Sequence, residues 1–119
     1  VGHYGCGGVS AALKKERIGL VDIWLRHVQD VHAKHAGNVD RLPPENRHDR
    51  LCELNVLEQV VNVCQTFVVQ DAWRREQSLT VHGWIYGLTD GLMHDLGITV
   101  HRPEDLQTRY DAALQALAE

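Results

Sequence analysis

The chain has 119 residues, of which 44% are hydrophobic and 24% are charged, a composition that is ordinary for one globular domain. Its formal net charge is −4 with histidine neutral, and its basic residues are scattered, so we do not expect a nucleic-acid partner. The sequence contains no run of about 18 uncharged apolar residues, so no membrane-spanning helix is predicted.

The chain opens with a glycine-rich segment that leads into two predicted helices. The first helix covers residues 9–17, and no strand is predicted ahead of it, although such an opening usually follows one. The second helix covers residues 20–36, and Gly37 fits just past its end. The apolar stripe of this second helix runs through Val21, Trp24, Val28 and Val31.

A central helix is predicted over residues 44–75, in one or two pieces, with Pro44 in its first turn. Its apolar residues cover most of its circumference, which is typical of a helix that is buried on all sides. These residues are Val56, Leu57, Val60, Val61, Val63, Cys64, Phe67, Val68 and Val69.

The C-terminal third predicts a hairpin and a last helix. Residues 78–88 alternate as a strand, Asp90 and Gly91 form a turn, and residues 92–100 are predicted to pair back. Two strands alone are marginal in water, so we expect another segment or chain to supply further parallel strands. The last helix opens at Pro103, and the residues that share its apolar face are Leu106, Tyr110, Ala113 and Leu117.

His3 and Cys6 form an H-x-x-C motif directly ahead of the first helix. The exposed amides and the dipole of a helix N-terminus stabilise a thiolate, and zinc accepts thiolate and imidazole ligands in tetrahedral geometry. Gly5, Gly7 and Gly8 allow the backbone to turn tightly and to approach a ligand. The spacing alone is a weak signal, and the alternative is a buried cysteine beside a surface histidine.

The other cysteines and histidines do not complete a zinc site. Cys52 and Cys64 are separated by about 18 Å along one helix, and we interpret both as structural. His27, His32 and His35 could bind a metal together, but a solvated helix face is the favoured interpretation. The histidines interpreted as surface residues are His48, His94 and His101. The remaining zinc ligands are therefore expected outside this sequence.

Cysteine usage and the N-terminal residues bear on the compartment. Three cysteines at wide spacing do not make a disulfide framework, and the segment VGHYGCGG lacks the basic start and the apolar run of a signal peptide. We therefore expect a reducing, cytoplasmic location.

Several ordered segments resemble one enzyme family. VGHYGCGGV resembles the second zinc motif of β-class carbonic anhydrases, and VHGWIYGLTDGL resembles the strand and hairpin that close that family's sheet. WLRHVQDVHAKH and ELNVLEQVVNV, which lie between them, resemble the family's helical segments. The chain is thus identified as the C-terminal half of a β-class carbonic anhydrase of bacterial type, with the bicarbonate-regulated subgroup as one alternative.

This resemblance implies an α/β fold, with a mostly parallel sheet flanked by helices and an antiparallel edge strand. Residues 1–119 would be the C-terminal portion of a single catalytic domain, whose N-terminal C-x-D-x-R motif does not occur in this sequence. His3 and Cys6 match the family's zinc-binding histidine and second cysteine, the first cysteine belongs to C-x-D-x-R, and the fourth ligand is either the aspartate of that motif or a water. The resemblance also implies a homo-oligomer, either a dimer or a tetramer.

The implied activity is that of a lyase, the reversible zinc-dependent hydration of carbon dioxide to bicarbonate and a proton by attack of zinc-bound hydroxide. The fragment alone is expected to be inactive. Gly7 and Gly8 would line the substrate pocket through backbone groups, although flexibility at a helix start explains them equally well. Tyr86 matches the tyrosine of a non-catalytic, allosteric bicarbonate pocket, although packing on one strand face is an equal alternative.

Two other functions remain open at this point. A non-catalytic module that senses bicarbonate or forms an oligomer would hold substoichiometric zinc and would hydrate no carbon dioxide. A related zinc hydrolase acting on carbon disulfide would keep the fold and the metal, and nothing in the sequence separates it from the hydratase.

Overall fold

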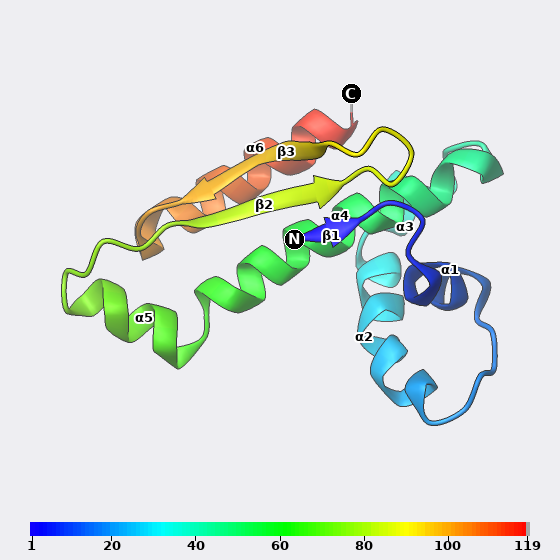
Figure 1. Cartoon of the computed structure of the whole chain (residues 1–119), viewed down its shortest axis with the longest axis horizontal. Helices are drawn as coiled ribbons and strands as arrows, with labels where there is room; N and C mark the ends of the chain where they lie inside the picture. The colour runs from blue at the N-terminus through cyan, green and yellow to red at the C-terminus, as the bar shows by residue number, and fades with distance from the viewer. Residues whose placement is uncertain (119) are drawn as a thin grey trace.

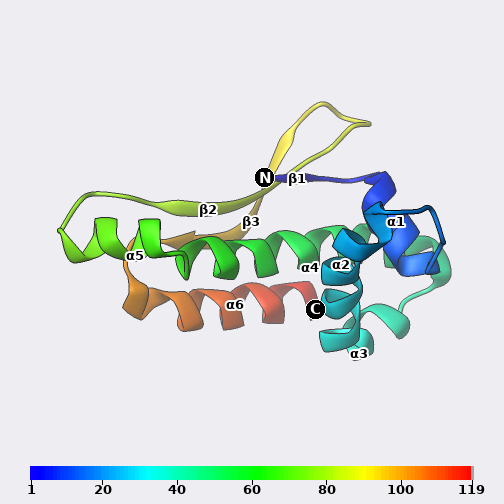
Figure 2. The ribbon, with the colours of Figure 1, turned by 90° about the horizontal axis from the view of Figure 1, so that it is seen from below.

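The computed structural model describes residues 1–118 as an α/β fold of helices around a small sheet (Figure 1). In chain order, the elements are β1 (Gly2–His3), α1 (Gly7–Lys14), α2 (Val21–Lys34), α3 (Ala36–Asp40), α4 (Pro44–Cys64), α5 (Phe67–Arg74), β2 (Val81–Tyr86), β3 (Met93–Val100), the 3-10 helix η1 (Pro103–Asp105) and α6 (Leu106–Ala118). The long helix α4 runs through the middle of the molecule and contacts all three strands (Figure 2).

The three described strands form one mixed sheet in the order β1-β2-β3. β1 pairs with β2 in parallel, and His3 lies opposite Tyr86. β2 and β3 are antiparallel, with Val81 opposite Val100 and a register shift next to Gly83. The predicted hairpin, the antiparallel edge strand and the α/β class are therefore confirmed, and the described sheet contains one parallel and one antiparallel pair.

β1 corrects the expectation that no strand precedes the first helix. A strand of two residues is too short to show alternation in the sequence, and it is defined by its partner, because the Tyr4 amide donates to the Tyr86 carbonyl oxygen at 3.0 Å. β1 also lies very close to α4. A Cβ atom at Gly2 would stand 2.5 Å from Val56 Cγ2, so only glycine permits this approach.

α4 and α6 lie side by side and cover one face of the sheet, with α4 against β2 and α6 against β3 (Figure 2). α1, α2 and α3 gather at one end of α4 (Figure 1). The core between these layers includes Leu51, Leu54 and Leu57, all with no exposed surface. Burying each of these leucine side chains stabilises the fold by about 2 kcal/mol, so α4 is the element on which the others are assembled.

The central predicted helix forms as two pieces, α4 and α5. α4 begins at Pro44 as predicted, and α5 begins behind Thr66, whose hydroxyl accepts a hydrogen bond from the Val69 amide at 3.4 Å. The predicted burial on all sides is wrong in part, because no described element covers one side of these helices. The apolar residues left exposed there are Val63, Phe67 and Val68.

α2 differs from its prediction at both ends. Val28 and Val31 are buried as the stripe predicts, but Val21 and Trp24 at its N-terminal end are exposed. Gly37 lies inside α3 and does not end α2.

The predicted apolar face of the last helix is confirmed, since all four of its residues pack into the core formed by α4, α6 and the hairpin. None of the described helices is both long and apolar enough to cross a membrane.

Candidate metal centre

The candidate metal centre is the metal loop, residues 2–8, which connects β1 to α1 (Figure 1). Its first residues belong to the sheet, and the chain then turns at Gly5, whose φ of +73° falls in the left-handed region that favours glycine. Cys6 follows as the N-cap residue of α1, and its carbonyl oxygen accepts the Ser10 amide at 3.0 Å. The loop is therefore fixed at one end by the sheet and at the other by a helix.

His3 is exposed, and one of its ring nitrogens is already engaged. Its Nδ1 lies 2.7 Å from the Tyr4 carbonyl oxygen. A carbonyl only accepts, so Nδ1 is the donor and the neutral ring carries its lone pair on Nε2. Histidines that bind metals commonly donate their second ring nitrogen to a carbonyl in this way. The tautomer of His3 therefore suits a metal ligand.

Cys6 is half-buried, and its side chain makes no hydrogen bond to the amides of the helix that it caps. The sulfur lies at the N-terminal end of α1, where the partial positive charge of the helix favours an anion. A Cβ atom built on Gly8 would stand 3.8 Å from this sulfur, which places the first turn of α1 directly beside it. One imidazole and one thiolate fit zinc in kind and supply two of the four ligands that zinc usually takes.

The described residues do not provide the other ligands. Within residues 1–118, no group of three or more histidine, cysteine, aspartate and glutamate side chains could hold a metal ion. Cys52 and Cys64 are both buried, as the structural interpretation predicts. Burial raises the pKa of the Cys52 thiol to about 11 and also raises the pKa of Cys64, so both thiols stay protonated.

α4 contacts the metal loop through two polar residues that sequence reasoning missed. His48 Nε2 donates to the Cys6 carbonyl oxygen at 2.9 Å, which corrects the surface interpretation of this histidine. The Tyr4 hydroxyl donates to Glu53 Oε2 at 2.7 Å. Burial and this contact with Glu53 raise the pKa of Tyr4 far above its usual value, so its hydroxyl remains a donor. No local pattern could reveal these contacts, because the partners lie more than forty positions apart.

The residues assigned to substrate and bicarbonate lie around the same loop. Gly7 is exposed, and a Cβ atom there would meet nothing within 4 Å, whereas a Cβ atom on Gly8 would stand 3.2 Å from Leu25 Cδ2. Gly8 therefore lets α1 pack against α2, and Gly7 borders open space. Tyr86 lies level with His3 at the end of β2, with 36% of its surface exposed.

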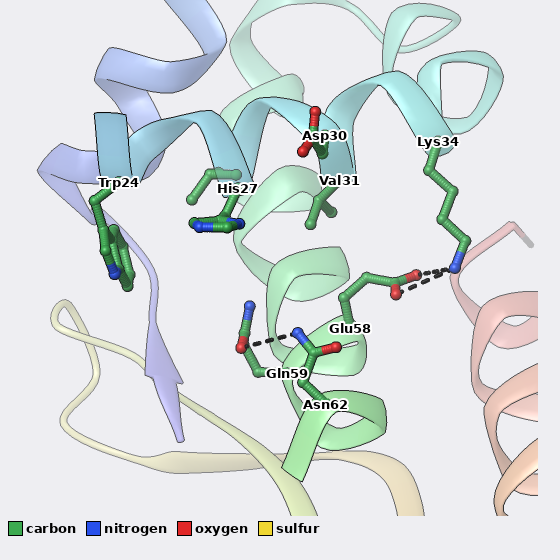
Figure 3. A pocket seen from close by; sticks show the side chains of 9 residues that line it. Trp24, His27, Asp30, Val31, Lys34, Glu58, Gln59 and Asn62 are labelled. Atoms are coloured by element: carbon green, nitrogen blue, oxygen red, sulfur yellow. Dashed lines mark hydrogen bonds and ion pairs between the residues drawn. The ribbon is translucent and has the colours of Figure 1, made fainter. Parts of the chain in front are cut away.

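A second concave region is a groove of about 420 Å³ between α2 and α4 (Figure 3). Trp24 and His27 stand at one end of the groove, and Lys34 reaches Glu58 at the other (Figure 3). The groove shares no residue with the metal loop. It is therefore a feature of the helical layer, separate from the candidate metal centre.

Glu58 is buried beneath this groove and is satisfied by three donors. Its Oε1 accepts hydrogen bonds from the Tyr110 hydroxyl and from His35 Nε2 at 2.7 Å, and its Oε2 accepts one from Lys34 Nζ at 3.2 Å. Burial opposes ionisation, but these donors outweigh it and lower the pKa of Glu58. His35 is thus nearly buried in a structural network, and the solvated face expected for it is wrong. His32 pairs separately with Asp40 at 2.9 Å.

Comparisons with known proteins agree on one family. The family described as carbonic anhydrase matches residues 1–93. A curated carbonic anhydrase of Emericella nidulans is 43% identical over 98 residues, which are 82% of this chain and 43% of that protein. A curated carbonic anhydrase of Synechocystis is 29% identical over 120 residues, covering 87% of this chain and 43% of that protein.

Solved structures of similar fold carry the same family name. A Coccomyxa β-carbonic anhydrase in complex with acetazolamide aligns with a TM-score of 0.82 and 37% identity, over 89% of this chain and 49% of that chain. A tetrameric β-carbonic anhydrase of Sordaria macrospora aligns with a TM-score of 0.73 and 31% identity, over 82% of this chain and 50% of that chain. The chain therefore spans about half the length of the relatives that it matches.

Proposed function

The chain belongs to the β-class carbonic anhydrase family, and on this premise we propose that it forms the His3 and Cys6 side of a zinc site that hydrates carbon dioxide to bicarbonate and a proton. The geometry of the metal loop carries the proposal. In this loop His3 Nδ1 donates to the Tyr4 carbonyl oxygen, and Cys6 is the N-cap residue of α1.

In the proposed site, His3 binds zinc through Nε2 and Cys6 binds it as a thiolate. When bound, zinc acts as a Lewis acid that brings the pKa of a water ligand from ~15.7 towards ~7. The hydrogen bond from His3 Nδ1 keeps the imidazole in one tautomer and one orientation. Cys6 lies at the N-cap of α1, beside the first turn of that helix. The His3 imidazole and the Cys6 sulfur are therefore both placed to bind a cation.

The remaining ligands come from outside residues 1–119 in this proposal. Because two protein ligands hold zinc weakly, the chain alone would be inactive. β1 is an edge strand of the described sheet, so its outer side can accept a further parallel strand. The exposed apolar residues of the helices offer the surface that such an addition would cover, and they include Val63, Phe67 and Val68.

Gly7 and Gly8 are proposed to border the carbon dioxide pocket. They form the first turn of α1, whose amide groups have no partner inside the helix and can bind the developing bicarbonate. The open space around Gly7 would admit a small molecule next to Cys6. Gly8 also has a packing role, because its lack of a side chain allows α1 to approach Leu25 of α2 closely.

We further propose a homo-oligomer as the working assembly. The tetrameric relatives from Sordaria macrospora support this, and so does a second group of exposed apolar residues on the α1–α2 connection and the start of α2. These residues are Ile18, Leu20, Ile23 and Trp24, each more than half exposed. Their burial between subunits would remove them from water.

The function is tested on the protein purified from its native source, together with whatever chain accompanies it. Zinc content is measured by elemental analysis, intact mass by mass spectrometry, and carbon dioxide hydration by stopped flow. The proposal predicts one zinc ion per site and catalysed hydration. Substoichiometric zinc and no hydration would favour the non-catalytic module, an alternative supported by the finding that residues 1–118 supply at most two ligands.

A further inference from the structure

The metal loop runs along α4 in the opposite direction to the helix, with one contact for every second loop residue. Gly2 lies against Val56, the Tyr4 hydroxyl donates to Glu53, and the Cys6 carbonyl accepts from His48. His3, which falls between the first two contacts, is exposed. The loop therefore uses its alternate residues to attach to α4 and leaves the imidazole outside.

The two segments are comparable in length. From His48 to Val56, α4 rises about 12 Å at 1.5 Å per residue. From Gly2 to Cys6, four steps of chain span at most about 14 Å when fully extended, and the turn at Gly5 shortens this distance. His48, Glu53 and Val56 also fall within about 140° of the helix circumference, so one face of α4 makes all three contacts.

Each of the two polar contacts is further fixed by its surroundings. Glu53 is oriented by Arg50, whose Nε donates to Glu53 Oε1 at 3.3 Å, and Arg50 also donates to the Asn38 side chain. The Cys6 carbonyl accepts both His48 and the Ser10 amide, so His48 acts on the residue where α1 begins. Arg50 and Glu53 are both mostly buried, which limits competition from water.

We propose that His48 and Glu53 are positioning residues for the metal centre, and that by holding Cys6 and Tyr4 on α4 they set where the Cys6 thiolate and the His3 imidazole stand. The expected effect on metal affinity rests on the proposed zinc site, but the attachment of the metal loop to α4 can be measured without a metal. Removing a group that orients a metal ligand typically lowers metal affinity by about 10-fold to 100-fold.

The test compares His48→Leu, which removes the donor, with His48→Gln, whose side-chain amide can donate from nearly the same place. His32→Leu is the matched control, because it removes a similar half-buried histidine contact that lies away from the loop. Hydrogen exchange of the Ser10 amide reports the loop directly, and the amides of β2 and β3 report global stability. Cobalt and zinc affinities are measured by titration on the same full chain together with its native partner.

We expect His48→Leu to speed exchange at Ser10 roughly fivefold, the equivalent of one hydrogen bond, and to weaken metal binding about tenfold or more. His48→Gln should restore both values, and His32→Leu should change neither. Equal Ser10 exchange in wild type and His48→Leu would overturn the proposal. Faster exchange in a protein that binds no metal would support the positioning role and reject the zinc site instead.

A second pair of variants covers the case in which His48→Leu does not fold. Tyr4→Phe removes one hydroxyl and leaves the pairing of Glu53 with Arg50 intact. Tyr4→Phe and Glu53→Leu should each weaken metal binding, and the double variant should be no weaker than the poorer single variant. Full metal affinity in Tyr4→Phe, or single-variant losses that add in the double variant, would overturn the role of Glu53.

Discussion

Tyr86 lies directly opposite His3 across the parallel pair of β1 and β2. The two side chains therefore leave the sheet on the same face, because opposite residues of paired strands share a face. The pairing depends on backbone groups, since the Tyr86 carbonyl accepts the Tyr4 amide. A change at the phenol can consequently be made without breaking the contact that holds the metal loop.

Tyr86→Phe tests the proposed bicarbonate pocket. If the phenol hydroxyl binds bicarbonate, wild-type hydration should fall as bicarbonate is added, most strongly at the low end of the pH profile, and Tyr86→Phe should lose this response. The measurement is stopped-flow hydration against pH at several bicarbonate concentrations, on the assembled enzyme. Identical profiles that are insensitive to bicarbonate would leave Tyr86 with packing as its role.

His3→Ala and Cys6→Ser should each reduce bound zinc to less than about a tenth of the wild-type content, because removing one ligand leaves an incomplete tetrahedral set. His32→Ala is the control, since His32 pairs with Asp40 and lies away from the metal loop. Elemental analysis after dialysis gives the zinc content. Full zinc retention in both ligand variants would contradict the assignment of these residues.

Gly2→Ala and Gly7→Ala form a matched pair at the two ends of the loop. The new methyl group at residue 2 would meet Val56, which is buried and cannot move freely, so we expect a loss of roughly 1–3 kcal/mol in unfolding free energy. At residue 7 the methyl group enters open space, and stability should be unchanged or slightly higher.

Gly7→Ala also tests the assignment of Gly7 to the carbon dioxide pocket. If Gly7 borders the carbon dioxide pocket, Gly7→Ala should lower kcat/KM while the protein remains as stable as wild type. Chemical denaturation and stopped-flow hydration separate the two effects. A stable Gly7→Ala enzyme with full activity would remove Gly7 from the pocket.

Glu58 predicts how stability depends on pH. Its folded pKa lies below its ordinary value of 4.5, because the donors Tyr110, His35 and Lys34 favour the carboxylate. Ionised Glu58 therefore stabilises the folded state, fully above about pH 4.5 and progressively less as the pH falls through the lowered folded pKa. Denaturation midpoints measured from pH 7 to pH 3 should show this decline.

Glu58→Gln should flatten that decline and should cost about 1–3 kcal/mol at pH 7, since it leaves buried donors with a weaker acceptor. Asp30→Asn is the matched control from the same groove. Asp30 is exposed and pairs with exposed Arg26, so its loss should change stability by less than about 0.5 kcal/mol. A Glu58→Gln protein that keeps the wild-type pH dependence would contradict this role.

Segments with periodic hydrophobicity, and segments that begin or end at proline or turn residues, were predictable from the sequence. The hairpin of β2 and β3 follows from alternation around Asp90 and Gly91, and the start of α4 follows from Pro44. The H-x-x-C motif identified His3 and Cys6 because zinc chemistry limits the residue types that can serve. These features are local, so a single sequence carries their signal.

Contacts between distant segments were not predictable. β1 has two residues and exists because β2 pairs with it, and no window of sequence shows that. The bond from His48 to the Cys6 carbonyl joins two segments that meet only after α4 has packed against the loop. The burial of His35 has the same origin, because its partners Glu58 and Tyr110 lie on other helices.

X-ray absorption at the zinc edge, measured on the zinc-loaded protein with its native partner, tests the metal centre most directly. Coordination through His3 and Cys6 predicts zinc–sulfur distances of about 2.3 Å and zinc–nitrogen distances of about 2.0–2.1 Å, with the zinc signal nearly lost in His3→Ala and in Cys6→Ser. A zinc spectrum that is the same in wild type and both variants, or a protein that holds no zinc, would contradict it.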